Sequence, residues 1–367
     1  MHTAAAIISL AQTHKNSLEY YLQSNHMPKQ LEVFHRHELN AMLLLNNEKP
    51  VALSQFLKCS FRNLETLINQ PTYKHYTIAK KKGGTRDIFA PEDNLKRIQK
   101  RLNYYLQAYY LCIKPKEVHG FVVNPHYMGT YYNIVGNAAA HTQKKVVLNI
   151  DLKDFFPSIS AKRVKDLFAS SYFNFNVQIA NALALLSTYQ GKLPIGAPTS
   201  PVISNFVCLS LDHDLSAFCK VHKLAFSRYA DDLTFSSDIP ISTDQILDII
   251  NIIKKNQFKI NEKKLRLKTN NRKQIVTGLT VNEKVNVDRK LLKKIRAMLH
   301  DLTRNGIDSA TKNHFNLKSA VETEHRAKFI QRLQGYINFV GLVRGKNDAL
   351  YLRSKMSFDE MFIGVAS

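Results

Sequence analysis

Two adjacent carboxylates stand at a turn between two apolar segments, in the stretch Ala225–Ser236 (AFSRYADDLTFS). Asp231 and Asp232 cannot easily relieve their mutual repulsion there, so one must be protonated or both must share a cation. Their oxygens suit a hard divalent cation, and no softer ligand lies nearby in the sequence. Because Asp favours turns, solvated Asp-Asp turns are common, and this pair alone does not identify a catalytic site.

A third carboxylate, Asp151, ends the β-branched segment Lys145–Asp151 (KVVLNID). We expect the strands ending on Asp151 and at Asp231 to be neighbours in an antiparallel sheet, which would bring three carboxylates to one edge. Such a group suits two divalent cations that clamp the attacking and leaving oxygens of a phosphoryl transfer. The separation of about eighty residues, with helices between, fits a split βαβ unit.

The charge of the chain indicates what the substrate would be. The 367 residues carry 52 Lys and Arg against 29 Asp and Glu, a formal net charge of +23. Such an excess opposes compaction by self-repulsion and therefore indicates a polyanionic partner, nucleic acid above all. A basic protein without such a partner is the alternative. Hydrophobic residues at 44% exclude a disordered chain.

The remaining composition bears on compartment. No apolar run reaches the roughly 20 residues of a membrane helix, and the apolar stretch at residues 4–11 has no basic leader. The widely spaced cysteines predict neither a zinc site nor a disulfide framework, and indicate a reducing compartment. They are Cys59, Cys112, Cys208 and Cys219. We expect a cytoplasmic protein with no membrane partner.

The apolar spacing and the positions of Pro and Gly predict a mostly helical chain with a few short strands. No internal repeat or low-complexity tract interrupts it. The expected helices cover residues 1–70, a segment from about 94, then 161–189, 202–220, 243–255 and most of 288–367. The expected strands are 145–151, two within 225–236, and 274–287.

Five segments in chain order resemble the motifs of reverse transcriptases. The core set is NIDLKDFFPSI, LPIGAPTSP and YADDLTFS. Upstream, KKKGGTRDIFAP followed by LKRIQKRL is similar to the fingers motif of that family, and downstream INEKKLRL resembles the motif after the catalytic hairpin. The resemblance runs from about residue 75 to 285, most of the chain. It implies an α+β fold of the right-hand polymerase type, with fingers, an antiparallel palm sheet and a helical thumb.

The resemblance also implies a division of the chain. Its parts would be an N-terminal helical region at 1–70, fingers at 71–145, a palm at 146–287 with fingers helices interleaved at about 161–192, and a thumb at 288–367. The thumb of such a polymerase grips the duplex. The C-terminal third is crowded with basic residues, among them Lys290, Lys293 and Lys294, so we expect a phosphate-binding surface there.

By the same resemblance, the carboxylates would form a metal site. Asp151, Asp231 and Asp232 would hold two Mg²⁺ ions, with Mn²⁺ as a possible substitute, helped by the backbone carbonyl of Leu152. One ion would lower the pKa of the primer hydroxyl, and the other would neutralise the leaving pyrophosphate.

Five residues around this centre, and Gly196 described below, would bind the nucleotide. Lys80 and Arg86 would grip the triphosphate, Arg86 bidentately, although a solvated basic hairpin is the alternative. Asp154 and Phe155 would offer backbone amides to the phosphates. Phe156 stands where the family places an aromatic gate that collides with a ribose 2′-hydroxyl and so selects deoxynucleotides; a core aromatic is the other reading.

Lys264 is the best candidate for the acid that protonates pyrophosphate, with Lys263 a close alternative. Gly196 would let the chain approach the nascent base pair closely. The residue before it departs from the family pattern, because Ile195 stands where Gln is common. A side-chain amide near the incoming sugar is therefore missing, which puts nucleotide affinity and fidelity in doubt.

Two further segments resemble signatures of retron reverse transcriptases. Residues 137–141 (NAAAH) match an NAxxH motif, and residues 276–278 match a VTG motif. Each alone is weak, since an Ala triplet is usually helix packing and Thr-Gly is usually a turn. We expect both segments to contact RNA, through Asn137, His141, Val276, Thr277 and Gly278. The nearby Tyr127, Tyr131 and Tyr132 could stack on RNA bases or pack internally.

A retron enzyme would be an RNA-directed DNA polymerase that copies its own structured non-coding RNA. By resemblance, it would prime from an RNA 2′-hydroxyl and yield branched multicopy single-stranded DNA in an anti-phage defence system. Its partners would be that RNA, the RNA–DNA hybrid, dNTPs and a separate effector protein. The alternatives are another bacterial reverse transcriptase, of the abortive-infection or diversity-generating type, and a non-catalytic RNA-binding scaffold with the same fold.

Overall fold

The computed structural model describes residues 3–80, 83–124 and 132–361. The chain forms two compact units. Unit 1 comprises Met1–Asn133, Asn149–Phe235 and Ile241–Arg266, and unit 2 comprises Ile134–Leu148, Ser236–Pro240 and Leu267–Ser367. Helices and strands occur in both units, so the expected α+β class is confirmed.

The N-terminal part of unit 1 is helical, as predicted. Its helices are α1 (Ala4–Thr13), α2 (Lys15–Ser24), α3 (Arg36–Leu45), α4 (Pro50–Phe56) and α5 (Phe61–Asn69), with a 3-10 turn η1 (Lys29–Leu31). Local signals define their starts: Pro50 is the first residue of α4, and the Ser60 hydroxyl caps α5 by accepting from the Asn63 N–H. Further along the chain, α8 (Ala161–Ala169) and α9 (Val177–Ser187) pack on one another.

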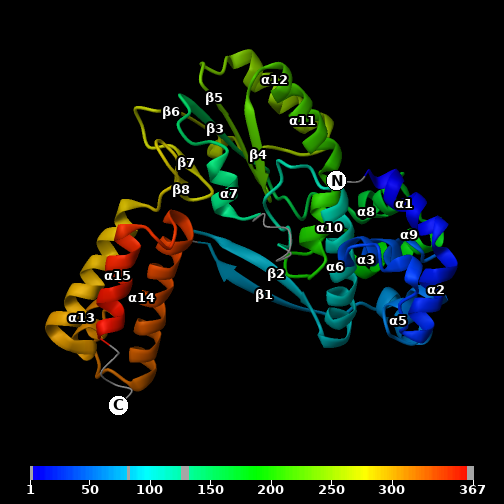
Figure 1. Cartoon of the computed structure of the whole chain (residues 1–367), viewed down its shortest axis with the longest axis horizontal. Helices are drawn as coiled ribbons and strands as arrows, with labels where there is room; N and C mark the ends of the chain where they lie inside the picture. Colours follow the sequence, from blue (N-terminus) through cyan, green and yellow to red (C-terminus); the bar gives the residue numbers. More distant parts are fainter. Residues whose placement is uncertain (1–2, 81–82, 125–131, 362–367) are drawn as a thin grey trace. The chain divides into compact units, whose positions relative to one another are not determined.

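A two-stranded antiparallel ribbon follows the N-terminal helices. Strand β1 (Tyr73–Ala79) pairs with β2 (Thr85–Pro91), and Arg86 lies opposite Ile78 (Figure 1). Gly83 and Gly84 have φ of 90° and 79°, a left-handed backbone that other residues adopt with strain. The ribbon leads into the predicted helix, α6 (Asp93–Ile113), which packs against α3.

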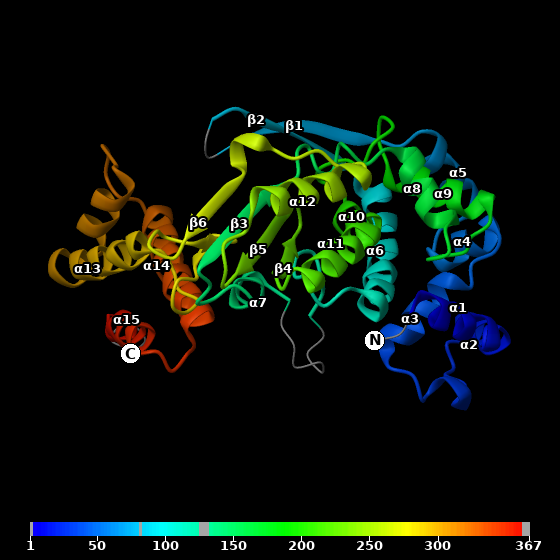
Figure 2. The same cartoon turned by 90° about the horizontal axis from the view of Figure 1, so that it is seen from above.

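The central sheet has the strand order β4-β5-β3-β6. Its strands are β3 (Val146–Asp151), β4 (Ala225–Tyr229), β5 (Asp232–Ser237) and β6 (Arg266–Thr269). The predicted strand before Asp151 and the predicted hairpin at Asp231–Asp232 are therefore confirmed. Within unit 1, α11 (Leu209–Val221) packs on β4 and beside α12 (Thr243–Lys255), while α10 (Ser200–Val207) packs on α6 (Figure 2).

Unit 2 contains three long helices and a small hairpin. Its elements are α7 (Ile134–Ala139), β7 (Ile275–Val276), β8 (Leu279–Thr280), α13 (Arg289–Phe315), α14 (Thr323–Arg344) and α15 (Ala349–Glu360). The backbone of α13 breaks at Gly306. Its core joins Val276 and Leu279 of the hairpin to apolar residues of the helices, such as Leu333. The strand expected over 274–287 is wrong in its length, since only these two-residue strands form.

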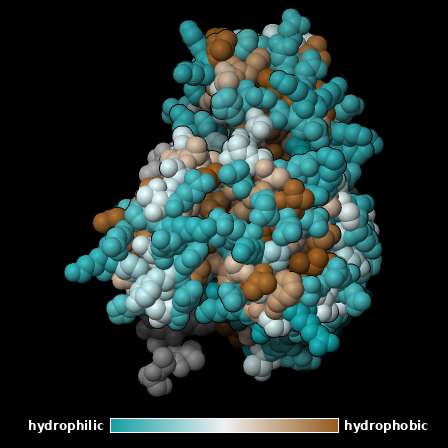
Figure 3. All heavy atoms as spheres, turned by 90° about the vertical axis from the view of Figure 1, so that its right-hand side faces the viewer, coloured by the Kyte–Doolittle hydropathy of each residue, from teal (hydrophilic) through white to brown (hydrophobic). Residues whose placement is uncertain are grey.

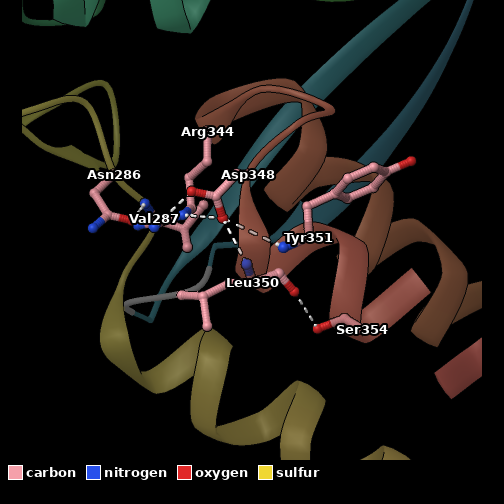
Figure 4. A network of polar contacts seen from close by, with 7 residues as sticks. All are labelled: Asn286, Val287, Arg344, Asp348, Leu350, Tyr351 and Ser354. Atoms are coloured by element: carbon pink, nitrogen blue, oxygen red, sulfur yellow. Dashed lines mark hydrogen bonds and ion pairs between the residues drawn. The ribbon is translucent and has the colours of Figure 1, made fainter. Parts of the chain in front are cut away.

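A polar network ties the ends of two of these helices together. The Arg344 guanidinium donates to both carboxylate oxygens of Asp348, at 2.9 and 2.8 Å, and to Oδ1 of Asn286 at 2.8 Å (Figure 4). Asp348 also caps α15 by accepting from the Leu350 N–H. Because every charge here is paired, the turn between α14 and α15 is firmly held.

Side chains on the face shown in Figure 3 are mostly hydrophilic, with apolar residues in small separate groups. Within the described residues, no helix is both long enough and apolar enough to cross a membrane.

Candidate active site

The two strands that carry the predicted metal-binding carboxylates meet at their ends in unit 1. Asp151 is the last residue of β3, and Asp231 lies in the two-residue connection between β4 and β5. The Leu152 N–H donates to the backbone carbonyl of Asp231 at 3.0 Å. Ala230, before Asp231, has a left-handed φ of 59°, which a residue with a Cβ adopts with strain. The structure thus brings Asp151 and the Asp231–Asp232 turn together, as the sequence predicted.

The acidity of these groups reflects their crowding. Burial raises the pKa of Asp231, and the nearby Asp151 carboxylate raises it further. Asp232 reaches solvent, yet the protein around it, together with Asp231 and Asp151, raises its pKa to about 6. Both shifts have the direction expected for carboxylates that are partly buried and repel one another, and the opposing effect of the Lys264 ammonium is smaller.

One ammonium group already lies against this cluster. The Nζ of Lys264, in the 3-10 turn η3 (Glu262–Lys264), donates to Oδ1 of Asp151 at 2.7 Å. The backbone sets this position, because the Asn261 N–H donates to the Asp151 carbonyl at 2.7 Å. Lys264 is half exposed, whereas Asp151 is nearly buried. Of the two lysines weighed from the sequence, Lys264 is therefore the one placed at the carboxylates.

The donor set fits divalent cations. The oxygens of Asp151, Asp231 and Asp232 are hard ligands, and a bound cation would stabilise the charged forms that burial and the neighbouring carboxylates disfavour at Asp231 and Asp232. Among residues 3–80, 83–124 and 132–361, no three His, Cys, Asp or Glu side chains form a ready-made ligand group. Sites for Mg²⁺ commonly complete their shells with backbone carbonyls, water and substrate phosphates, so these carboxylates suffice as anchors.

A cavity of about 700 Å³ opens beside the carboxylates, entirely within unit 1. Its lining includes most of the residues predicted to bind the metal or the nucleotide or to act in catalysis. They are Lys80, Arg86, Asp151, Leu152, Asp154, Phe155, Phe156, Asp231 and Lys264. A volume of this size is typical of a small-molecule site.

Two predicted residues, Asp232 and Gly196, are absent from the cavity lining. Gly196 has a φ of 116°, and a Cβ there would stand 2.8 Å from Cγ2 of Ile88 and 3.0 Å from the carbonyl of Phe89. The glycine therefore permits a close approach to strand β2 in this structure. Contact of Gly196 with a nucleotide stays a prediction.

The aromatic pair after Asp154 divides into one buried and one half-exposed ring. Phe155 is buried and stacks on Phe258, with ring centroids 5.8 Å apart. Phe156 is partly exposed on the cavity wall and lies 5.8 Å from Phe121. Asp154 has a left-handed φ of 48°. Of these two rings, Phe156 is thus the more accessible from the cavity.

Basic groups from the ribbon face the same cavity. Lys80 and Arg86 line it, and the positive charge of Arg86 acts on Asp231 to lower its pKa against the larger effect of burial. Ile195 also lines the cavity, and its backbone carbonyl accepts from the Phe89 N–H at 2.8 Å. The departure from the family pattern therefore lies in the candidate nucleotide site itself.

Behind the carboxylate turn lies a buried ion pair that the sequence analysis missed. Arg228 and Asp212 are fully buried, and the guanidinium donates to both carboxylate oxygens at 2.6 Å. Burial alone would lower the pKa of Arg228, but the Asp212 carboxylate outweighs it and keeps the guanidinium charged. The sequence held one signal for this pair, which is an Arg within a mostly apolar predicted strand. A charge buried in such a strand needs a partner of opposite charge.

The two retron-like segments meet in unit 2. Thr277 and Gly278, with φ of 46° and 84°, form the turn between β7 and β8, and the Thr277 hydroxyl donates to the carbonyl of Ile134 in α7 at 3.2 Å. Asn137, His141 and Val276 are buried. His141 Nδ1 is 2.7 Å from the Ser236 hydroxyl. Direct contact of these side chains with RNA stays a prediction, and their burial favours a role in shaping the surface.

Asn137 differs from its neighbours in one respect. Neither its amide nitrogen nor its amide oxygen has a hydrogen-bond partner within the described residues. The lysines predicted to bind phosphates, Lys290, Lys293 and Lys294, are exposed on α13, as a phosphate-binding surface requires. Of the three tyrosines considered, Tyr127 and Tyr131 lie outside the described residues. The ring of Tyr132 lies 3.9 Å from the Lys114 ammonium.

Several known proteins are similar to this chain in sequence. A family model described as reverse transcriptase (RNA-dependent DNA polymerase) matches residues 78–320. The chain is 32% identical to the retron Mx65 reverse transcriptase of Myxococcus xanthus, over 66% of this chain and 59% of that protein. It is also 32% identical to the retron Ec86 reverse transcriptase of Escherichia coli, over 72% of this chain and 82% of that protein. A third relative is the retron Ec73 reverse transcriptase of Escherichia coli, 34% identical over 63% of this chain and 76% of that protein.

The match thus spans about three fifths of the Mx65 protein and most of the Ec86 protein. Among solved structures, the chain is similar to telomerase from Candida albicans in complex with a fragment of telomeric RNA. The TM-score is 0.44 and the identity is 10%, over 81% of this chain and 64% of that one.

Proposed function

The chain belongs to the reverse transcriptase family, and from this premise we propose that it is an RNA-directed DNA polymerase that copies the structured non-coding RNA of a retron. The observation that carries the proposal is the meeting of Asp151 with the Asp231–Asp232 turn at one end of the sheet, beside a cavity that basic groups line.

The carboxylates would be the anchors of the catalytic centre. Asp151, Asp231 and Asp232, with the carbonyl of Leu152, would hold two Mg²⁺ ions, for which Mn²⁺ could substitute. When bound, such cations supply the charge that activates a primer hydroxyl and neutralises pyrophosphate. The raised pKa of Asp232 supports this role, since a group so crowded gains most from a counter-ion.

The other cavity residues would bind and orient the nucleotide. Arg86 and Lys80 would hold the triphosphate, and the backbone amides of Asp154 and Phe155 would donate to its oxygens. The ring of Phe156 would lie under the sugar and exclude a 2′-hydroxyl. Lys264 would give a proton to the leaving pyrophosphate, for which its exposed ammonium at Asp151 is well placed.

Unit 2 would also carry residues that bind nucleic acid. Lys290, Lys293 and Lys294 would neutralise backbone phosphates of the RNA–DNA hybrid. The Asn137–His141 and Val276–Gly278 segments, which pack together, would form the surface that recognises the cognate RNA.

The retron assignment rests on the relatives and on these two segments. From it follow priming by an RNA 2′-hydroxyl, a branched multicopy single-stranded DNA product, and a separate effector protein in anti-phage defence. We expect this activity in the cytoplasm, where its RNA and dNTP substrates are found.

The test replaces both turn carboxylates. The Asp231→Ala/Asp232→Ala protein should incorporate no dNTP on a poly(rA)·oligo(dT) template, while it binds RNA as tightly as the parent. Incorporation at the parental rate would contradict the metal assignment. Sequencing of DNA that copurifies with the parent tests the retron assignment, because DNA without a branch to RNA would indicate another type of reverse transcriptase.

A further inference from the structure

The buried side chain of Arg228 makes hydrogen bonds beyond its ion pair with Asp212. Besides the two bonds to Asp212, the Arg228 guanidinium donates to the backbone carbonyl of Ala230 at 3.2 Å and to Oδ1 of Asn205 at 2.9 Å. The Asn205 amide in turn donates to the carbonyl of Gly120 at 3.0 Å. One buried side chain therefore joins helices α10 and α11 to the turn that carries Asp231.

The backbone of the segment Glu117–Gly120 also packs against strand β4 and the turn. The Arg228 N–H donates to the Glu117 carbonyl, and the His119 N–H donates to the Arg228 carbonyl, both at 3.0 Å. Gly120 then passes so close to the turn that a Cβ on it would lie 2.4 Å from the backbone nitrogen of Ala230. Real Cβ atoms do not approach backbone so closely, so only glycine fits here without moving the turn.

Stability alone does not account for this arrangement. A buried ion pair generally stabilises a fold no better than apolar residues of similar volume, because both charges lose their hydration. The pair does, however, impose geometry, since a guanidinium presents its donors in a fixed plane. The turn needs such restraint, because Ala230 holds a left-handed φ that the chain would otherwise relax.

We propose that Arg228 is a positioning residue, which with Asp212 and Asn205 fixes the Ala230–Asp231 turn and so sets the orientation of the metal-binding carboxylates. The inference rests on the proposed function, since it concerns how the same site is held. Arg228 acts through the carbonyl of Ala230 and touches no substrate.

The main test removes both charges at once. Arg228→Met or Asp212→Leu alone would leave an unpaired buried charge and destabilise the fold. The double variant Arg228→Met/Asp212→Leu has neither charge and keeps similar volumes, so it should fold. We expect its Mn²⁺ affinity, measured in the full chain by electron paramagnetic resonance, to fall roughly 10- to 100-fold. Its kcat on poly(rA)·oligo(dT) should fall about 100-fold, with little change in KM for dTTP.

Two single variants keep the test decisive if the double variant does not fold. Arg228→Lys retains the charge opposite Asp212 but cannot supply the planar set of donors, so it should fold and show the same loss of Mn²⁺ affinity. Gly120→Ala leaves the pair intact and presses on the turn directly, so it should show that loss as well. Parental Mn²⁺ affinity and kcat in any of these folded proteins would overturn the proposal.

Controls separate this outcome from other failures. Arg344→Met removes an arginine that is also bonded to both oxygens of an aspartate, but in unit 2, and should change neither Mn²⁺ affinity nor kcat. The Asp231→Ala/Asp232→Ala protein marks the loss of the metal site. If it binds Mn²⁺ as the parent does, the proposed metal site fails. If it loses Mn²⁺ while Arg228→Met/Asp212→Leu does not, the positioning role alone fails.

Discussion

The backbone N–H of Leu152 donates to the carbonyl of Asp231 across 3.0 Å, so the two strands that carry the carboxylates are joined where they end. Next to this bond, the Lys153 N–H donates to the Lys259 carbonyl and the Asn261 N–H to the Asp151 carbonyl, each at 2.7 Å. Backbone hydrogen bonds therefore bring the Asp151 and Asp231 segments and the segment before Lys264 together.

Replacing Lys264 by Met should separate metal binding from catalysis. The Lys264 ammonium lies 2.7 Å from Asp151 and competes with a cation for that carboxylate. The variant should therefore bind Mn²⁺ more tightly than the parent. Its kcat should nevertheless fall by roughly 100-fold, because the leaving pyrophosphate loses its acid. Electron paramagnetic resonance and single-turnover incorporation measure the two effects.

Lys263→Met is the matched variant, because it removes the neighbouring ammonium that the sequence left as an alternative. Its Mn²⁺ affinity and its kcat should both change much less than those of Lys264→Met. The opposite result, with Lys263→Met slow and Lys264→Met at the parental rate, would transfer the acid role to Lys263.

Replacing Phe156 by Ala should relax the choice of sugar. Its ring is the half-exposed aromatic on the cavity wall, and its loss would admit a 2′-hydroxyl. We expect the ratio of kcat/KM for rNTPs over dNTPs to rise about 10- to 100-fold. Phe155→Leu is the control, because that ring is buried against Phe258 and should affect stability without changing the ratio. An unchanged ratio in Phe156→Ala would make Phe156 a packing residue.

Local signals allowed part of this fold to be predicted. Helix α12 occupies the expected residues 243–255, because Ser242 and Gln245 form a capping box before an apolar helical pattern. Strand β3 is buried almost throughout. A buried strand is apolar on both faces, so its sequence is a continuous run of β-branched and other apolar residues, and this run predicted the strand. The carboxylate site was accessible for the same reason, since its members end or join recognisable strands.

What the sequence did not show depends on tertiary contacts. Strand β1 is almost entirely exposed, so it has no apolar alternation to reveal it. The Arg228 network unites residues from two helices, a strand and the segment at Gly120, and no spacing along the chain encodes that contact. Burial of Asn137 and Val276 was equally hidden, because each lies within a motif that suggested a role at the surface.

Lys114 should make stability depend on pH. Its side chain is 1% exposed, and burial above all lowers its pKa from 10.5 to about 8. Between these values the unfolded chain holds more protons on this group than the folded one, so the free energy of unfolding rises with pH. Below pH 8 the full cost of the buried charge is present.

Lys114→Met should therefore be more stable than the parent at neutral pH, by up to about 3 kcal/mol. This advantage should shrink as the pH rises through the window from about 8 to 10.5. Urea unfolding at several pH values measures it. Lys162→Met removes an exposed lysine and should show no such dependence. A parent-to-variant difference that stays constant with pH would mean that Lys114 is not the titrating group.

Replacing Lys290, Lys293 and Lys294 by Gln should weaken binding to nucleic acid in a salt-dependent way. These lysines are exposed on α13, where each can neutralise a phosphate and release a counterion. Each lost contact should reduce the slope of log affinity against log salt by about 1, so the triple variant should lose about 3. Fluorescence anisotropy with a labelled RNA–DNA hybrid at several salt concentrations measures the slope.

The control for charge alone removes three exposed lysines of unit 1, Lys29, Lys162 and Lys220. It lowers the net charge equally, so any effect of overall charge on long-range attraction should appear in both proteins. Only in the α13 variant should the slope of log affinity against log salt become smaller, because only the α13 lysines would contact phosphates. Equal slopes in the two variants would mean that α13 attracts nucleic acid without contacting its backbone, and the assignment of this helix as the duplex-gripping surface would be wrong.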